Sequence, residues 1–338
     1  MIPGRQLVRP GKKEEDNIKR LFFSEQCQCV RSESFFYMQA DKAITGERSA
    51  QDNLFVVGMV LSMTCWGFSW TSGKLLSAYG DPLTISFLRF ALTFVSLIFI
   101  LLAMKEKMTL SKKGAFALIA ASILISIYTF LFFQGVAVGK AGAGGVLVTV
   151  LNPIMTYAIT LVALRRKPTR NEAIGLTLGL AAGIVLLRLV DHAEDIFKAG
   201  NIYFLLAAFS WSFLSRFTAK ASRYGSSLAF SFWMYAISTC LVFLFTSFES
   251  VTNTVSSGDL TFWGNLFFSA TITTSLATTF FFVATSRIGA SKASSFIFMV
   301  PFSAALGSWI FLGEVIEAHT IIGGVLGIAA VYILNRKN

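Results

Sequence analysis

From Leu54 to the C-terminus, apolar runs of 15 to 25 residues alternate with short polar breaks, which restricts the chain to a membrane-spanning fold. The chain is 54% apolar and 14% charged, whereas a soluble domain has about 25% charged residues. Because a spanning helix needs about 20 apolar residues, the sequence predicts an all-α integral membrane protein with ten transmembrane helices. The predicted spans are 54–72, 83–103, 115–135, 142–163, 172–188, 199–217, 228–247, 261–285, 293–312 and 319–335.

Residues 1–53 differ from the rest of the chain. They contain nine Lys/Arg and eight Asp/Glu without a sustained apolar period, which predicts a cytosolic and mostly disordered tail. The segment lacks the apolar core and cleavage site of a signal peptide. Met38 is an alternative start of the chain.

The positive charges are distributed unequally between the two ends of the predicted spans. The side of the N-terminus holds 24 Lys/Arg, and the opposite side holds four, namely Lys74, Lys140, Arg188 and Lys198. Under the positive-inside rule, this ratio predicts that both termini are cytoplasmic. The net charge of +11 follows from this topology and gives no reason to expect a nucleic-acid partner.

The chain also resembles itself. An offset of 145 residues gives nine identities in the 30 positions from 61 to 90, among them Trp66 with Trp211, and an offset of 148 pairs Pro153 with Pro301. We interpret this as a duplicated five-helix unit, with repeats at 54–190 and 199–335. Because five is odd, the second repeat enters the membrane from the opposite side. Inverted repeats of this kind are the construction that secondary transporters use for alternating access.

Several short motifs occur in order along the two repeats. They are Trp66-Gly67-Phe68-Ser69, Asp81-Pro82, Arg89-Phe90, Asn152-Pro153, Pro301, Phe311-Leu312-Gly313-Glu314 and the pair Gly323 and Gly327. With these motifs the chain resembles the EamA-type branch of the drug/metabolite transporter superfamily, over about residues 54–335. The resemblance implies a ten-helix transporter of small metabolites, often an exporter of amino acids or related compounds. Where the first half should repeat Gly313-Glu314, it has Arg165-Arg166.

Arg89 is the one charged residue well inside a predicted span. An intramembrane arginine needs a partner or a wet cavity, which makes it a functional candidate. Alternatively it extends toward the membrane surface or caps backbone carbonyls. Because the resemblance places an arginine here across varied substrates, we favour a structural or gating role over substrate recognition.

Polar residues at helical spacing form stripes on three predicted helices, and each stripe lies on a single face. Such a face either lines a wet cavity or lets helices pack closely; three stripes together favour a cavity. Asn152-Pro153 interrupts a helix, and Trp66 and Trp211 are related by the repeat. The candidate substrate-cavity residues are Trp66, Ser69, Arg89, Ser126, Thr129, Thr149, Asn152, Thr156, Trp211, Thr274 and Thr278.

Other chemistry lacks a sequence signal. No Asp or Glu lies in the middle of a predicted span, and there is no metal-ligand cluster, nucleotide motif or Ser/His/Asp arrangement. We therefore expect no catalytic residues, no metal and no cofactor. Small-residue faces at Gly175, Gly179 and Gly183, and at Gly323 and Gly327, fit tight helix packing or a homodimer contact.

Together these observations predict a secondary transporter in a lipid bilayer, more often an exporter, for a small-molecule solute such as an amino acid. The resemblance makes a bacterial inner membrane the default location. An exchanger of phosphorylated metabolites or nucleotide sugars is the alternative within the superfamily. Two alternatives of another class are a membrane enzyme acting on lipid-linked groups and a non-transporting scaffold.

Overall fold

The computed structural model describes residues 50–165, 167–190, 197, 200–218, 221–281, 284 and 296–335. The chain divides into two compact units, residues 1–56 and 57–338. In the first unit the described residues, 50–56, are helical and begin α2. The rest of the predicted tail lies outside the described residues.

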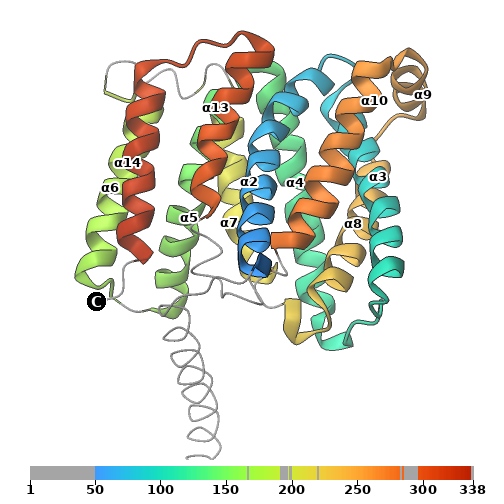
Figure 1. Ribbon diagram of the computed structural model, residues 1–338, viewed down its shortest axis with the longest axis horizontal. Helices are drawn as coiled ribbons and strands as arrows, with labels where there is room; N and C mark the ends of the chain where they lie inside the picture. Colours follow the sequence, from blue (N-terminus) through green and yellow to red (C-terminus); the bar gives the residue numbers. More distant parts are fainter. Residues whose placement is uncertain are drawn as a thin grey trace, which may run out of the picture. The chain divides into compact units, whose positions relative to one another are not determined.

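The described residues form helices and connecting loops, without a strand among them (Figure 1). Most helices coincide with predicted spans within a few residues. The exception is the predicted span 228–247, which ends at Phe243 and is followed by a separate ten-residue helix. The elements are α2 (Ala50–Leu76), α3 (Pro82–Met104), α4 (Ala115–Val138), α5 (Ala141–Leu164), α6 (Arg170–Leu186), α7 (Asn201–Thr218), α8 (Ser227–Phe243), α9 (Phe248–Ser257), α10 (Leu260–Phe267), the π-helix η4 (Phe268–Ala277), the short 3-10 helix η5 (Phe296–Phe298), α13 (Met299–Leu312) and α14 (Ala318–Asn335).

The lengths and apolar character of the helices suit a membrane. Five helical segments in the described part are long and apolar enough to cross a bilayer. α8 and α9 meet at a bend of 108°, and α13 and α14 are apolar but shorter. Large apolar side chains such as Phe99, Phe116 and Val162 are at least two-thirds exposed, as expected for an exterior that faces lipid.

Short polar motifs set the helix boundaries. Asp81 begins α3: its carboxylate accepts hydrogen bonds from the N–H groups of Leu83 and Thr84, and proline occupies the first helical position. Thr169 and Glu172 form a capping box at the start of α6. These caps satisfy the N–H groups that a helix leaves free at its start, and they fix where each helix begins.

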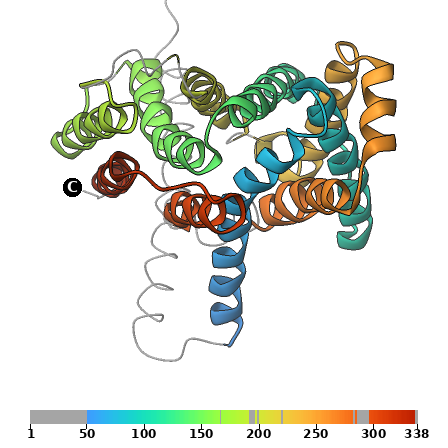
Figure 2. The same cartoon turned by 90° about the horizontal axis from the view of Figure 1, so that it is seen from above.

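Within the unit of residues 57–338, helices from the two predicted repeats pack in pairs. α6 lies against α14, α5 against α13, α3 against α8, and α4 against α7. Figure 2 shows the red helices α13 and α14 facing the green helices α5 and α6. The glycine faces are used in this packing, since a Cβ on Gly175 would meet Leu334 and one on Gly323 would meet Leu186.

Candidate functional site

A cavity of about 380 Å³ lies among the helices of the second unit. α2, α3, α4 and α5 line it together with α7, α8, η4, η5, α13 and α14. Ten of the eleven predicted residues line this one cavity: Trp66, Ser69, Arg89, Thr129, Thr149, Asn152, Thr156, Trp211, Thr274 and Thr278. The volume is within the range of about 300–1,000 Å³ that is usual for small-molecule sites.

Ser126 does not line the cavity. Its hydroxyl donates a hydrogen bond to the carbonyl of Ser122, four residues earlier on the same helix, at 2.8 Å. α4 instead lines the cavity through Ile125, Tyr128 and Thr129. Of the two candidates on this helix, Thr129 therefore lines the cavity and Ser126 does not.

On α5 and α14 the cavity extends toward one end of the helix. Its lining on α5 runs from Thr149 to Thr160, and on α14 from Gly327 to Leu334, so it follows the C-terminal halves of both helices. At the border of the lining, Trp70 packs edge-on against Phe132 and Phe204, with ring centroids 4.7 and 5.8 Å away. Because these three rings are at most 3% exposed, the packing closes the helix bundle toward the N-terminal end of α5.

Arg89 is the one Lys, Arg, Asp or Glu among the described residues that line the cavity. Its Nη2 donates to the hydroxyl of Thr274 at 2.9 Å. The guanidinium carbon lies 5.6 and 5.8 Å from the ring centroids of Phe132 and Phe133, within the range of cation–π attraction. Nε is buried and has no hydrogen-bond partner among the described residues, so the polar groups around Arg89 satisfy it only in part.

The π-helix η4 forms one wall of the cavity. The hydroxyls of Thr274 and Thr278 donate to carbonyls five residues earlier, at 2.7 and 3.3 Å. The carbonyl of Thr273 also accepts from Trp66 Nε1 at 3.3 Å, which ties η4 to α2. π-helices are frequent at functional sites, and this one, with the residue that caps it, brings Thr273, Thr274 and Thr278 to the cavity.

Asn152-Pro153, within α5, forms another part of the cavity wall. Pro153 has no N–H to donate to the carbonyl four residues earlier. The carbonyl of Asn152 accepts from Ser212 at 3.2 Å, whereas its side-chain Oδ1 is buried without a partner in the described part of the chain. This segment thus offers an unmatched acceptor beside the cavity.

Aromatic rings complete the lining. Trp66 packs against Phe281 with centroids 5.3 Å apart, and Trp211 packs against Tyr128 at 4.7 Å. The sequence did not indicate most of the aromatic and apolar lining residues, because the same residue types also occur where a spanning helix faces lipid or packs against another helix. The main residues missed are Trp70, Phe90, Tyr128, Tyr157, Ser215, Tyr235, Thr273, Val300, Pro301 and Val331.

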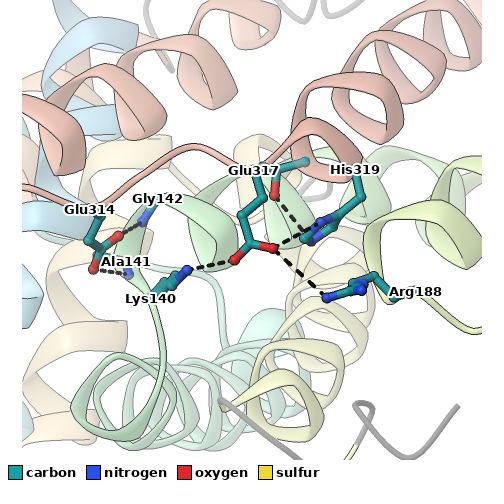
Figure 3. A network of polar contacts seen from close by, with 8 residues as sticks. Lys140, Ala141, Gly142, Arg188, Glu314, Glu317 and His319 are labelled. Carbon is teal, nitrogen blue, oxygen red and sulfur yellow. Dashed lines mark hydrogen bonds and ion pairs between the residues drawn. The ribbon is translucent and has the colours of Figure 1, made fainter. Parts of the chain in front are cut away.

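A polar cluster holds the α13–α14 loop at the start of α5, at the end away from the cavity (Figure 3). The two carboxylate oxygens of Glu314 accept from the N–H groups of Ala141 and Gly142, each at 2.9 Å. Glu317 pairs with Lys140 at 2.6 Å, and Arg188 lies 4.0 Å from the same carboxylate. The Gly313-Glu314 motif therefore caps a helix of the first half.

The Glu317 pair predicts a small dependence of stability on pH. The hydrogen bond from Lys140 lowers the pKa of Glu317 below its ordinary value of 4.5, so the stabilisation is present above the unfolded-state pKa and is lost as pH falls through the folded-state value. We expect Glu317→Gln to lower the melting temperature slightly at neutral pH and to match wild type in strong acid. The effect is about 0–1 kcal/mol because both side chains are over 40% exposed.

Thermal unfolding in detergent at several pH values measures this difference. Two further groups face Glu317, namely Arg188 and His319, whose Nδ1 lies 3.4 Å from the carboxylate. A gap between the two proteins that widened toward acid would contradict the prediction.

Comparison with known proteins identifies the family. The EamA-like transporter family matches residues 53–188 and again residues 198–336. The uncharacterized transporter YoaV of Bacillus subtilis is 25% identical, over 80% of this chain and 93% of that protein. A probable amino-acid metabolite efflux pump of Salmonella typhimurium is 23% identical, over 81% and 92%.

The fold also has a counterpart among solved structures. One crystal structure matches with a TM-score of 0.55 at 15% identity, covering 83% of this chain and 94% of the other. Apolar helices and transporter relatives together describe a multi-pass membrane protein. Because the family matches the chain twice and covers both halves of its helical part, this protein belongs to the EamA-like transporter family.

Proposed function

We propose that this protein is a secondary transporter that moves a small metabolite by alternating access. The observation that carries the proposal is the cavity, which is lined by polar and aromatic residues from helices of both predicted repeats and is closed at one end. A binding site at the junction of two repeats is what alternating access requires. A structural or signalling membrane protein has no comparable need for two inverted repeats.

Ten spans in two inverted repeats, 54–190 and 199–335, agree best with the packing. α3, α5 and α6 each pack against the helix at the corresponding place in the second repeat, namely α8, α13 and α14. A pseudo-two-fold axis in the membrane plane generates such pairs. The second family match begins close to the second repeat.

The charge distribution orients this arrangement. With 24 Lys/Arg on one side and four on the other, both termini and the tail 1–53 are cytoplasmic. The C-terminal ends of α5 and α14 then lie at the cytoplasmic side, and the cavity follows those ends. The conformation is accordingly inward-facing, with the closed end toward the exterior, in the plasma membrane of a bacterium.

The transported solute is an amino acid or a related compound, and the direction is export. The Salmonella relative supports this class through its description as an amino-acid metabolite efflux pump. A phosphorylated substrate would need several cationic groups, whereas the described lining contributes Arg89 alone.

Asn152→Leu tests the function. Removing the amide from the cavity while keeping the side-chain volume is expected to reduce solute flux about tenfold or more, since losing one well-placed hydrogen bond weakens binding by about 1.4 kcal/mol. Flux is measured in proteoliposomes against a panel of amino acids and their derivatives. Ser126→Ala, outside the cavity lining, is the matched control and should transport like wild type.

Two results would count against the proposal. If wild type carried no solute of the panel above empty liposomes, the transporter assignment would fail. If Asn152→Leu and Ser126→Ala both transported at the wild-type rate, the cavity would not be the route.

A further inference from the structure

We infer that Arg89 anchors a single carboxylate of the transported molecule, an inference that rests on the transport function proposed above. From the sequence alone, a structural or gating role seemed better supported. The contacts of the Arg89 side chain favour substrate recognition instead. Arg89 lines the cavity, and its Nη2 donates a hydrogen bond to the hydroxyl of Thr274, another residue of the cavity wall.

The positive charge of Arg89 favours an anionic ligand in the cavity. No Asp or Glu occurs among the described residues that line the cavity, so the guanidinium faces Thr274 and aromatic rings but no anion there. A buried cation without a counter-charge is unfavourable, and Coulomb attraction is stronger in the low dielectric of a membrane protein's interior than in water. An anion that enters the cavity therefore binds favourably at Arg89.

The hydrogen-bonding capacity of Arg89 favours a carboxylate as that anion. The buried Nε of Arg89 has a donor that no described residue accepts. Arginine recognises a carboxylate through two parallel N–H···O bonds. An incoming carboxylate would supply both the missing charge and the missing acceptor.

The single cation of the described lining also limits the ligand to one anionic group near Arg89. A single carboxylate neutralises the single cation of the lining. A phosphate monoester carries about −1.5 to −2 at neutral pH and would leave uncompensated negative charge in the cavity. The same lining thus favours a carboxylate over a phosphate.

The rest of the cavity suits the remainder of such a molecule. Asn152 Oδ1 and the Thr273 hydroxyl are buried without partners among the described residues, and both residues line the cavity. An amine or another N–H group would satisfy such acceptors. The rings of Trp66 and Trp211 offer an apolar surface for a side chain. The ligand class is therefore a small monocarboxylate with a hydrogen-bond donor and an apolar body.

Matched ligands test this inference directly. Binding to the full-length protein in lipid nanodiscs is measured by tryptophan fluorescence, with L-phenylalanine, L-leucine, L-phenylalaninamide and phenyl phosphate as probes. We expect at least one of the two carboxylates to bind, phenylalaninamide to bind about tenfold or more weakly than L-phenylalanine or L-leucine, and phenyl phosphate to bind more weakly still.

Variants separate an anchoring role from a merely structural one. Arg89→Gln should reduce the preference for phenylalanine over phenylalaninamide to about one, and Arg89→Lys should restore part of it. A structural role would lower both affinities and leave their ratio unchanged. Ser126→Ala is the control and should keep the wild-type ratio.

The outcomes are distinct from those that test transport. Equal binding of phenylalanine and its amide to wild type, tighter binding of phenyl phosphate, failure of both carboxylates to bind, or an unchanged ratio in Arg89→Gln would each overturn the inference. If flux of amides or amines persisted in proteoliposomes in any of these cases, the proposed transport function would stand and only the carboxylate-anchoring role of Arg89 would be rejected. Absence of flux for every solute would remove the transport function itself.

Discussion

Replacing Gly67 with alanine is expected to lower the melting temperature of the protein sharply and to abolish most of its transport. A Cβ at this position of α2 would lie 2.8 Å from the backbone nitrogen of Ala304 and 2.9 Å from the carbonyl carbon of Ser303, on α13. Because backbone atoms cannot rotate aside, the two helices must separate. Overpacking of this kind costs about 1–3 kcal/mol, and the upper end applies here. Trp66 and Ser69 on either side line the cavity, so its shape changes as well.

Gly264→Ala is the matched control. Gly264 also lies in a helix, α10, but a Cβ there would meet nothing within 4 Å. We expect this variant to be as stable as wild type, or up to about 1 kcal/mol more stable because alanine favours the helix. Thermal unfolding in detergent and flux in proteoliposomes measure both variants. Equal melting temperatures for Gly67→Ala and Gly264→Ala would show that α2 and α13 can move apart freely.

Glu314→Gln is expected to weaken the contact between the α13–α14 loop and the start of α5 by about 1–2 kcal/mol, the usual contribution of a charged helix N-cap. The substitution keeps the length of the side chain but removes the charge that faces the start of α5 and leaves one acceptor oxygen for the N–H groups of Ala141 and Gly142. Since this contact closes the end away from the cavity, its loss also favours opening there.

Thermal unfolding and thiol labelling measure the two effects of Glu314→Gln. Ser308, 1% exposed on α13 beside this cluster, is replaced by cysteine in a background without native cysteines, and its reaction with an impermeant maleimide should become faster. Glu106→Gln, in an exposed loop, is the control and should change neither. Unaltered labelling together with an unaltered melting temperature would contradict a latching role for Glu314.

The sequence predicted the helices and most of the polar cavity lining for a simple physical reason. A hydroxyl or amide group stands out in an apolar helix, and the spacing of such groups defines a helix face. Thr149, Asn152 and Thr156 were therefore predicted on one face, and all three line the cavity. Ser126 shares this helical spacing but lies outside the lining, where its hydroxyl donates to its own helix. Whether the lining residues bind substrate stays a prediction.

The other features of the fold and of the cavity depend on tertiary contacts, which the spacing of residues along the sequence does not indicate. Tyr128 and Tyr235 line the cavity but look like any other aromatic residue of a spanning helix. The π-helix η4 has bonds at intervals of five residues, whereas the prediction assumed ordinary helical spacing. The partner of Glu314 lies about 170 residues away along the chain, and no local pattern indicates it.

Charged side chains from two other segments satisfy the free backbone groups on either side of the short turn between α4 and α5. Lys74 of α2 donates to the carbonyls of Ala137 and Gly139 at the end of α4, and Glu314 accepts from the first N–H groups of α5. Lys74 of α2 therefore contacts the negative, C-terminal end of α4, and Glu314 contacts the positive, N-terminal end of α5. α2 also packs against α13 at Gly67. If the protein opens at this end, the Glu314 contact with α5 is the one that must break, whereas Lys74 can keep α2 attached to the end of α4.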